Sequence, residues 1–241
     1  MKLSIIVPVL NEEKILEKML TSLKEFTSLE HEVIVSDGHS TDRTVEIAQK
    51  YADRVVAHDG KSRQTIGQGR NAGAEVATGE YLLFLDADVF VPNPNEFFPK
   101  AIKKFEDNPK LTALTVVVKT LPEYETWADK ISWACIAYFM RFMNNVLHQG
   151  TALGEFQMFR RKDFERVGGY SKTLVMGEDN EMFLRMSKIG QTRLDPNLYV
   201  MHTSRRAHNM GWPSLWMLWI VNIPSNLIRK KSIVKEWKVS R

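Results

Sequence analysis

The stretch Tyr81-Leu-Leu-Phe-Leu-Asp-Ala-Asp88 decides the fold of this 241-residue chain. Its five leading apolar residues are too few for an ordinary helix, and Gly79 and Pro92 bound the stretch, which favours a buried strand. Residues i and i+2 of an extended chain share one face, so Asp86 and Asp88 can point at one ligand. In an open parallel sheet the ligand crevice lies at the carboxyl ends of the strands, where this pair is expected.

Two carboxylates held together repel each other unless a cation or a basic side chain lies near them. A hard divalent cation that bridges carboxylate and diphosphate oxygens is the simplest such partner. The alternative is a pair of Asp residues chosen only for the turn that follows the strand. The residues alone leave both interpretations open.

Strands and helices alternate before this stretch, which predicts repeated βα units. The expected strands are residues 4–9, 32–36 and 54–57, and the expected helices are residues 12–26, a second one opened by 40–44, and 64–77. Beyond it we expect strands at 111–119, 156–159 and 193–201 and helices at 127–147 and 178–189. The pattern predicts an α/β fold with a mostly parallel sheet flanked by helices.

Composition is that of an ordinary folded enzyme, with 44% hydrophobic residues and a single cysteine, Cys135, which excludes an internal disulfide. No signal-peptide pattern opens the chain, and no run reaches the roughly 18 apolar residues of a membrane-spanning helix. We therefore expect a cytoplasmic protein.

The C-terminal tail combines apolar and basic residues. From Ser204 onward the chain has eight Lys and Arg residues against Glu236, a net charge of +7 that leaves −3 for the rest. The apolar stretch 212–223 precedes most of these charges, which predicts peripheral contact of residues 212–241 with the inner face of the cell membrane. A helix packed on its own domain or a homo-oligomer interface are the alternatives. Nucleic-acid binding is not expected, because the positive charge is confined to one end.

Five motifs in order, residues 8–13, 36–44, 69–71, 86–88 and 177–179, resemble those of family 2 glycosyltransferases of the GT-A (Rossmann-like) fold. The resemblance implies a GT-A domain over residues 1–203, with a nucleotide-binding half at 1–90 and an acceptor and catalytic half at 91–203. Residues 204–241 then form a basic amphipathic helical tail.

The resemblance implies a role for each motif. The residues implied in nucleotide-sugar binding are Pro8, Val9, Leu10, Glu12, Asp37, Arg70, Asp86 and Ala87. Glu12 would accept from ribose hydroxyls and Asp37 from the imide N–H of the base, since an ionised carboxylate is acceptor-only. Taken without the resemblance, both are more simply explained as a residue of a first helical turn and a turn residue.

The metal and the catalytic base are implied in the same way. Asp88 and Asp86 would bind Mg²⁺ or Mn²⁺ on the diphosphate, with His202 as a further ligand. Asp179 would take the proton from the acceptor hydroxyl in one inverting displacement, and Glu178 beside it would orient the acceptor. The alternatives are a structural histidine and an acidic first turn of a helix.

The expected function is therefore metal-dependent, inverting transfer of a hexosyl or N-acetylhexosaminyl group from a nucleotide-diphosphate sugar, with UDP ahead of GDP. The aromatic helix at 127–147 and the apolar tail suggest a lipid-linked or membrane-proximal acceptor, although a core helix explains the former more simply. Transfer to a polyprenyl phosphate, which needs no strong base, and a non-catalytic sugar-nucleotide-binding scaffold are the alternatives. A phosphatase with the same Asp pair would carry its nucleophile after the first strand, where Pro8 to Asn11 stand instead.

Overall fold

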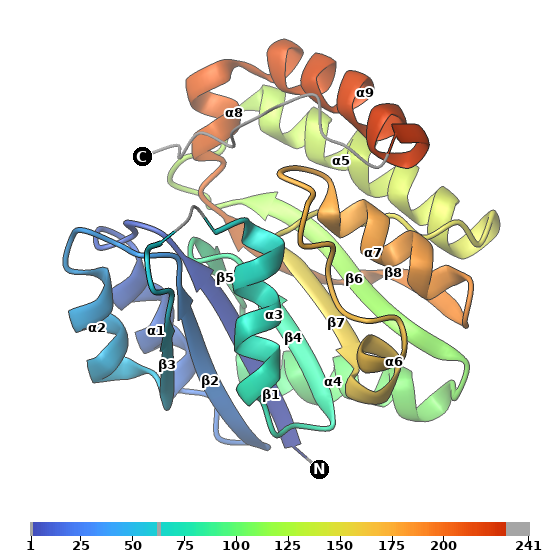
Figure 1. Cartoon of the computed structure of the whole chain (residues 1–241). Helices are drawn as coiled ribbons and strands as arrows, with labels where there is room; N and C mark the ends of the chain where they lie inside the picture. The colour runs from blue at the N-terminus through green and yellow to red at the C-terminus, as the bar shows by residue number, and fades with distance from the viewer. Residues whose placement is uncertain (1, 62–63, 230–241) are drawn as a thin grey trace.

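The computed structural model describes residues 2–61 and 64–229, drawn in Figure 1. The strands are β1 (Lys2–Val9), β2 (Glu30–Asp37), β3 (Arg54–Ala57), β4 (Tyr81–Leu85), β5 (Val89–Phe90), β6 (Leu111–Thr120), β7 (Phe156–Arg160) and β8 (Gln191–His202). The α-helices are α1 (Leu16–Lys24), α2 (Thr44–Tyr51), α3 (Ile66–Val76), α4 (Pro94–Asp107), α5 (Trp127–Arg141), α6 (Arg161–Arg166), α7 (Glu178–Ser187), α8 (Arg205–Met210) and α9 (Trp212–Arg229).

The described strands form one eight-stranded sheet in the order β3-β2-β1-β4-β7-β6-β8-β5. Its first four strands are parallel to one another, as the βα repeats predict. The second half is mixed, because β7 runs antiparallel to both β4 and β6, and β5 runs antiparallel to β8, while β6 and β8 are parallel. The sheet is thus parallel throughout in the half that ends at the acidic stretch and mixed in the other half.

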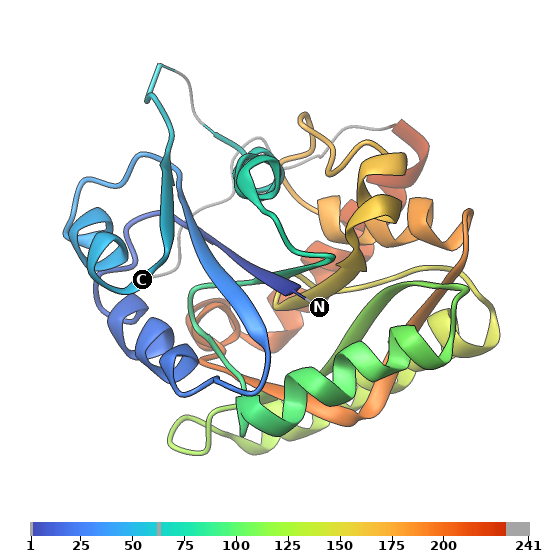
Figure 2. The same cartoon turned by 90° about the horizontal axis from the view of Figure 1, so that it is seen from below.

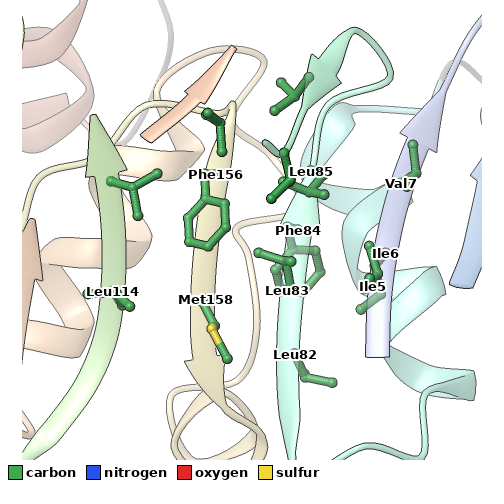
Figure 3. Packing of buried hydrophobic residues seen from close by; sticks show 14 of the residues in the cluster. Ile5, Ile6, Val7, Leu82, Leu83, Phe84, Leu85, Leu114, Phe156 and Met158 are labelled. Carbon is green, nitrogen blue, oxygen red and sulfur yellow. The ribbon is translucent and has the colours of Figure 1, made fainter. Parts of the chain in front are cut away.

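The core lies around the central strands β1, β4 and β7. Figure 3 shows Ile5, Ile6 and Val7 beside Leu82 to Leu85 of β4, with Phe156 and Met158 on the other side. All of these side chains are at most 1% exposed. A strand buried on both faces is expected to read as a continuous apolar run, and Tyr81 to Leu85 has this pattern. The strand predicted first from the sequence is therefore the centre of the molecule.

Helices cover both faces of the sheet (Figures 1 and 2): α3 and α6 lie on one face, and α1 and α4 lie on the other. The α3 helix comes close to β1, since a Cβ built on Gly73 would lie 2.4 Å from Cγ2 of Ile6. The glycines of α3 therefore serve close packing of a helix on the sheet. On the opposite face Phe26, after α1, packs against Phe98 of α4 with the two rings tilted and their centroids 4.5 Å apart.

Several elements differ from the sequence-based expectation. The helix expected over residues 127–147 is α-helical only to Arg141 and continues as a π-helical turn, η1 (Phe142–Val146). Asn144 explains the change, because its buried amide donates to the carbonyls of Met140 and Thr151 and accepts from Thr192. Four elements were not expected from the sequence. β5, α6 and α8 are short, whereas α4 buries Phe97, Phe98, Ala101, Ile102 and Phe105 at helical spacing and could have been predicted.

The described part of the C-terminal tail packs on α5. Asp129 of α5 is fully buried and accepts from His208 Nε2 at 2.9 Å and from Trp212 Nε1 at 2.8 Å. The rings of Trp133 and Trp212 meet edge to face, 5.2 Å apart. No helix among the described residues is long and apolar enough to cross a bilayer. Residues 230–241, which carry most of the predicted membrane-binding charge, lie outside the described residues.

Candidate active site

One cavity of about 780 Å³ opens at the carboxyl ends of β1 and β4, beneath α8 and α9. Most residues singled out from the sequence line it: Pro8, Val9, Leu10, Glu12, Arg70, Asp86, Ala87, Asp88, Glu178, Asp179 and His202. Asp37 is not among the lining residues. The structure therefore gathers motifs from both halves of the chain around one space, as strand ends at a switch point in an open sheet are expected to do.

Arg70 ties the two halves together from a fully buried position on α3. Its Nη1 donates to Glu178 Oε1 at 2.7 Å, and its Nη2 donates to Asp86 Oδ1 at 3.0 Å and to the carbonyl of Gly154 at 3.1 Å. A planar guanidinium can serve all of these acceptors at once. Arg70 thus joins Asp86 of one motif to Glu178 of another, and its predicted role in nucleotide-sugar binding stays a prediction.

Glu178 and Asp179 begin α7 after Gly177, whose positive φ of 78° suits glycine. Burial raises the pKa of Glu178, and the neighbouring Asp179 raises it further, while Arg70 opposes both. Burial also raises the pKa of Asp179, against the effect of Arg70. Asp179 is partly exposed to the cavity, and its Oδ1 accepts from the backbone N–H of Asn180 at 2.7 Å. It is thus the more accessible proton acceptor of the two.

Asp88 lies in a second cluster at the end of β8. Its Oδ2 is 3.0 Å from Arg205 Nε and 3.3 Å from His202 Nε2, and it accepts from the hydroxyl of Thr203. Burial alone would raise the pKa of Asp88, but His202 and Arg205 outweigh burial and hold the pKa well below its usual range. The same attraction outweighs burial at His202 and raises its pKa to about 9.

Arg205 also reaches the first βα loop. Its Nη2 lies 3.0 Å from Glu12 Oε2 and 3.2 Å from Oε1. Burial nevertheless raises the pKa of Glu12 to about 7, with Arg205 opposing the shift and Asp88 adding to it. Arg205 therefore holds α8 across the cavity, because it contacts both Glu12, the predicted ribose-binding residue, and Asp88, the predicted metal ligand.

The donor atoms of Asp88 and His202 fit a divalent cation in type and spacing. Two atoms 3.3 Å apart can share an ion that each contacts at about 2.1 Å. In the structure His202 Nδ1 accepts from the backbone N–H of Ser204 at 3.0 Å, which requires a neutral ring with its proton on Nε2, although the raised pKa favours the imidazolium. A ring that bound a metal through Nε2 would carry its proton on Nδ1, so the bond to Ser204 must break before His202 can act as such a ligand.

Asp86 is turned away from this pair toward Arg70. Within residues 2–61 and 64–229 no three His, Cys, Asp or Glu side chains converge as a ready metal site. The predicted trio of Asp86, Asp88 and His202 is therefore not assembled in the structure, and a metal would take further ligands from the diphosphate and water. The ligand roles stay predictions.

Asp37 holds the turn after β2. Its carboxylate accepts from the backbone N–H groups of His39 at 3.1 Å and Ser40 at 3.0 Å, and its side chain is 2% exposed. The neighbouring residues Ser36 and Gly38 line the cavity instead. The predicted contact of Asp37 with a nucleobase stays a prediction, and it needs a carboxylate that already accepts two bonds to accept a third.

Glu155 lines the cavity just before β7 and was not predicted from the sequence as a site residue. Its Oε2 is shielded from solvent and has no hydrogen-bond partner, and burial raises the pKa of the carboxyl to about 7, with His202 opposing the shift. The signal in the sequence was an acidic residue between Gly154 and a buried apolar strand. Asp86 shows the opposite order, because there the acidic residue follows the strand.

The other end of the cavity is apolar. Its walls come from α5 and α9, and the lining side chains there are Trp133, Ile136, Phe139, Met140, Leu215, Trp216, Trp219 and Ile220. The aromatic helix expected at 127–147 therefore contributes both to the core and to the cavity wall, and its contact with an acceptor stays a prediction. Trp133 and Ile136 are buried, while Phe139 is 54% exposed.

A mixed sheet flanked by helices, with acidic residues from β4 and α7 around one cavity, defines the class of GT-A glycosyltransferases. Residues 4–168 match the model of the family described as "Glycosyl transferase family 2". The chain belongs to glycosyl transferase family 2, and the expectations of this family and of a glycosyltransferase enzyme are confirmed.

Relatives by sequence include proteins described as glycosyltransferases. An uncharacterized glycosyltransferase of Haemophilus influenzae is 37% identical over 200 residues, which are 76% of this chain and 61% of the relative. TarS of Staphylococcus aureus, a poly(ribitol-phosphate) beta-N-acetylglucosaminyltransferase, is 38% identical over 96 residues, 38% of this chain and 17% of the relative. The succinoglycan biosynthesis protein ExoA of Rhizobium meliloti is 27% identical over 193 residues, which are 77% of this chain and 58% of the relative. The chain thus spans less than two thirds of each of these relatives.

Solved structures share the fold at lower identity. The mannosyltransferase PcManGT of Pyrobaculum calidifontis, in complex with GDP-Man and Mn²⁺, has a TM-score of 0.74 at 21% identity and covers 94% of this chain and 64% of its own. TarS 1–349 of S. aureus in complex with UDP-GlcNAc has a TM-score of 0.64 at 19% identity and covers 98% of this chain and 68% of its own. The predicted GT-A fold is confirmed.

Proposed function

We propose that this chain transfers a sugar from a nucleotide-diphosphate donor to an acceptor hydroxyl, with inversion and with a divalent cation. The observation that carries the proposal is that Asp88 and Asp179, from motifs 91 residues apart, line the same cavity in separate clusters. One cluster has the donor atoms to hold a metal diphosphate, and the other has a carboxylate of raised pKa. These are the two requirements of a single displacement at an anomeric carbon.

On the donor side, the chain binds and orients the nucleotide. Pro8, Val9 and Leu10 offer an apolar edge for the base, and Glu12 offers acceptors for ribose hydroxyls. Asp88 and His202 would hold Mg²⁺ or Mn²⁺, which when bound offsets charge on the departing diphosphate as a Lewis acid. Arg205, which contacts Asp88 in the structure, would be free to donate to the diphosphate oxygens if a cation took its place.

On the acceptor side, Asp179 takes the proton of the attacking hydroxyl. The acceptor oxygen forms a bond to the anomeric carbon as the bond from that carbon to the diphosphate oxygen breaks. The electron pair of the broken bond stays on the nucleoside diphosphate, and the proton stays on Asp179 until solvent removes it. Arg70 holds Glu178 beside the base and so fixes the start of α7.

Both UDP and GDP occur among the donors bound to similar structures, so the fold does not separate them. UDP is the donor we propose, with GDP as the alternative. A non-catalytic sugar-nucleotide-binding scaffold is disfavoured, because a binding site alone has no need of a carboxylate such as Asp179 that faces the cavity and whose pKa is raised.

The apolar end of the cavity supports an acceptor with a hydrocarbon part. Trp216 and Trp219 of α9 face Phe139 and Met140 of α5 across it. A lipid-linked acceptor would place its chain there and its hydroxyl toward Asp179. If the acceptor carries a phosphate, its oxygen is already anionic, and Asp179 is then not required as a base.

The outer apolar face supports a site next to a membrane. This face consists of exposed side chains of α5, η1 and α9: Trp127, Ile131, Tyr138, Phe139, Phe142, Val146, Leu147, Met217 and Ile220. Each is at least 44% exposed, and scattered single apolar residues would not gather on adjoining helices in this way. We propose that the chain binds the cytoplasmic face of the cell membrane peripherally through this face and the basic tail.

A transfer assay tests the proposal. UDP- and GDP-sugars are incubated with the protein, Mn²⁺ or Mg²⁺, and either a short-chain lipid-linked acceptor or its soluble head group. We expect a product of inverted anomeric configuration by NMR, formed faster with the lipid-linked acceptor and not in EDTA. Retained configuration, or transfer unaffected by EDTA, would contradict the mechanism.

A further inference from the structure

We propose that Glu155 binds hydroxyl groups of the donor sugar and thereby helps to select which sugar is transferred. The inference rests on the proposed function, because it assigns a residue to the space between the diphosphate and the base. It concerns a residue that none of the five sequence motifs contains.

The first observation is an oxygen without a partner. Glu155 Oε2 is shielded from solvent and makes no hydrogen bond, a state it shares, among the described residues, only with Ser36 Oγ, Arg70 Nε and Gln157 Nε2. Buried polar groups are nearly always hydrogen-bonded, and a carboxylate is the most costly to leave unpaired. A carboxyl oxygen accepts when the group is ionised and can donate when it is protonated, and a hydroxyl group can partner it in either state.

The second observation is the position of this side chain. Glu155 lines the same cavity as His202 and Asp179, and the charges of both residues act on its carboxyl. His202 belongs to the cluster assigned to the diphosphate, and Asp179 belongs to the cluster assigned to the acceptor. In a single displacement the group between the diphosphate and the acceptor is the sugar itself, whose ring hydroxyls are hydrogen-bond donors.

The backbone before β7 is fixed so that the side chain cannot leave this position easily. A Cβ built on Gly154 would lie 2.9 Å from Arg70 Nη2 and 3.1 Å from Asp86 Oδ2, so only glycine allows this close approach. The carbonyl of Gly154 accepts from Arg70, and the next residue, Phe156, is 1% exposed. Glu155 is thus held between two anchored neighbours, as a preorganised binding residue should be.

A role as a further metal ligand is the main competing explanation. No three metal-ligating side chains converge within the described residues, so Glu155 does not complete a site with Asp88 and His202. A sugar contact and a metal contact also make different predictions. A metal ligand acts on the nucleoside diphosphate and its sugar conjugate equally, whereas a sugar contact acts on the conjugate alone.

Calorimetry on the full chain separates the two. Wild type, Glu155→Gln and Glu155→Ala are each titrated with a nucleoside diphosphate and with its sugar conjugates, all with Mn²⁺. UDP is compared with UDP-glucose and UDP-GlcNAc, and GDP is compared with GDP-mannose. We expect both variants to bind the nucleoside diphosphate within about twofold of wild type, and the preferred nucleotide sugar about 10- to 100-fold more weakly, the value of a charged hydrogen bond. Glu80→Gln, an exposed change before β4 at the opposite end of that strand, should leave both affinities unchanged.

Each other outcome overturns the assignment. Equal weakening of the diphosphate and its conjugate would place Glu155 at the metal, and unchanged affinities would give it no role. We also expect the melting temperature of Glu155→Gln to match or exceed that of wild type, because an unpaired buried carboxylate is removed. A fall in melting temperature in both variants would indicate a structural residue. If wild type binds no nucleotide sugar at all, the proposed function fails and this inference fails with it.

Discussion

Arg205 Nε lies 3.0 Å from Asp88 Oδ2, so the chain's own cation sits on the carboxylate that we expect to bind the metal. Arg205 belongs to α8, which is part of the C-terminal tail, whereas Asp88 follows the central strand β4. Metal binding and movement of α8 should therefore be linked, because two cations cannot share one oxygen without mutual repulsion.

The first prediction concerns this pair. Arg205→Ala removes the competing charge, so the affinity for Mn²⁺ without nucleotide should rise about tenfold, which equals 1.4 kcal/mol. The rate of sugar transfer should fall, because a donor to the diphosphate is lost. Isothermal titration with Mn²⁺ measures the first effect, and Arg193→Ala, an exposed change on β8, serves as the control. An unchanged Mn²⁺ affinity would show that Arg205 does not compete with the ion.

The second prediction concerns the buried arginine of α3. Arg70→Met leaves Glu178 and Asp86 without their shared partner, and removal of one member of a buried ion pair costs about 3–5 kcal/mol. We expect a loss of this size in the free energy of unfolding by urea. The exposed pair of Arg161 and Glu165, 2.9 Å apart, provides a matched control, since Arg161→Met should cost less than about 1 kcal/mol. Similar losses at both sites would refute the anchoring role of Arg70.

The third prediction concerns the catalytic base. Asp179→Asn should lower kcat by about 10²- to 10⁴-fold and leave the KM for the donor nearly unchanged. Because the pKa of Asp179 is raised by burial, the base form prevails only at a higher pH than for an ordinary carboxyl. In wild type kcat should therefore rise with pH along a limb that lies above the usual carboxyl range, and this limb should vanish in the variant. A full rate in Asp179→Asn would favour a phosphate acceptor.

The fourth prediction concerns the outer apolar face. A double change, Tyr138→Ser with Phe142→Ser, removes two exposed rings without touching the core. If these rings enter the interface, each contributes up to about 1.5–3 kcal/mol, so partition onto anionic liposomes at low salt should fall at least about tenfold. Tyr199→Ser, an exposed aromatic change on β8, is the control. Equal sedimentation of all three proteins would contradict membrane docking by this face.

Local pattern predicted the half of the fold that precedes Asp88 well. The strands at 54–57 and 81–85 have the expected bounds, because each short apolar run is closed by turn residues. The pairing of β7 between β4 and β6 was out of reach, since register between strands distant in sequence depends on packing, not on either strand alone. The π-helical turn depended on one buried amide, Asn144, whose partners come from three separate segments.

The candidate site divides in the same way. Motif spacing predicted which residues would surround the cavity, but it did not predict how their charges pair. The bond between Arg70 and Glu178 joins positions 108 residues apart, and Arg205 joins Glu12 across 193 residues. Glu155 could not be found from the sequence, because the observation that singles it out is a shielded carboxyl oxygen without a hydrogen-bond partner. Only the three-dimensional packing shows this.

The most direct test of the central claim is calorimetric binding of UDP and GDP, each with Mn²⁺, Mg²⁺ or EDTA, to wild type and Asp88→Asn. The account predicts that one of the two nucleotides binds wild type only when a divalent ion is present, and that this binding weakens at least about tenfold in the variant. Nucleotide binding of equal strength in EDTA and in Asp88→Asn, or no binding by folded wild-type protein under any condition, would contradict it.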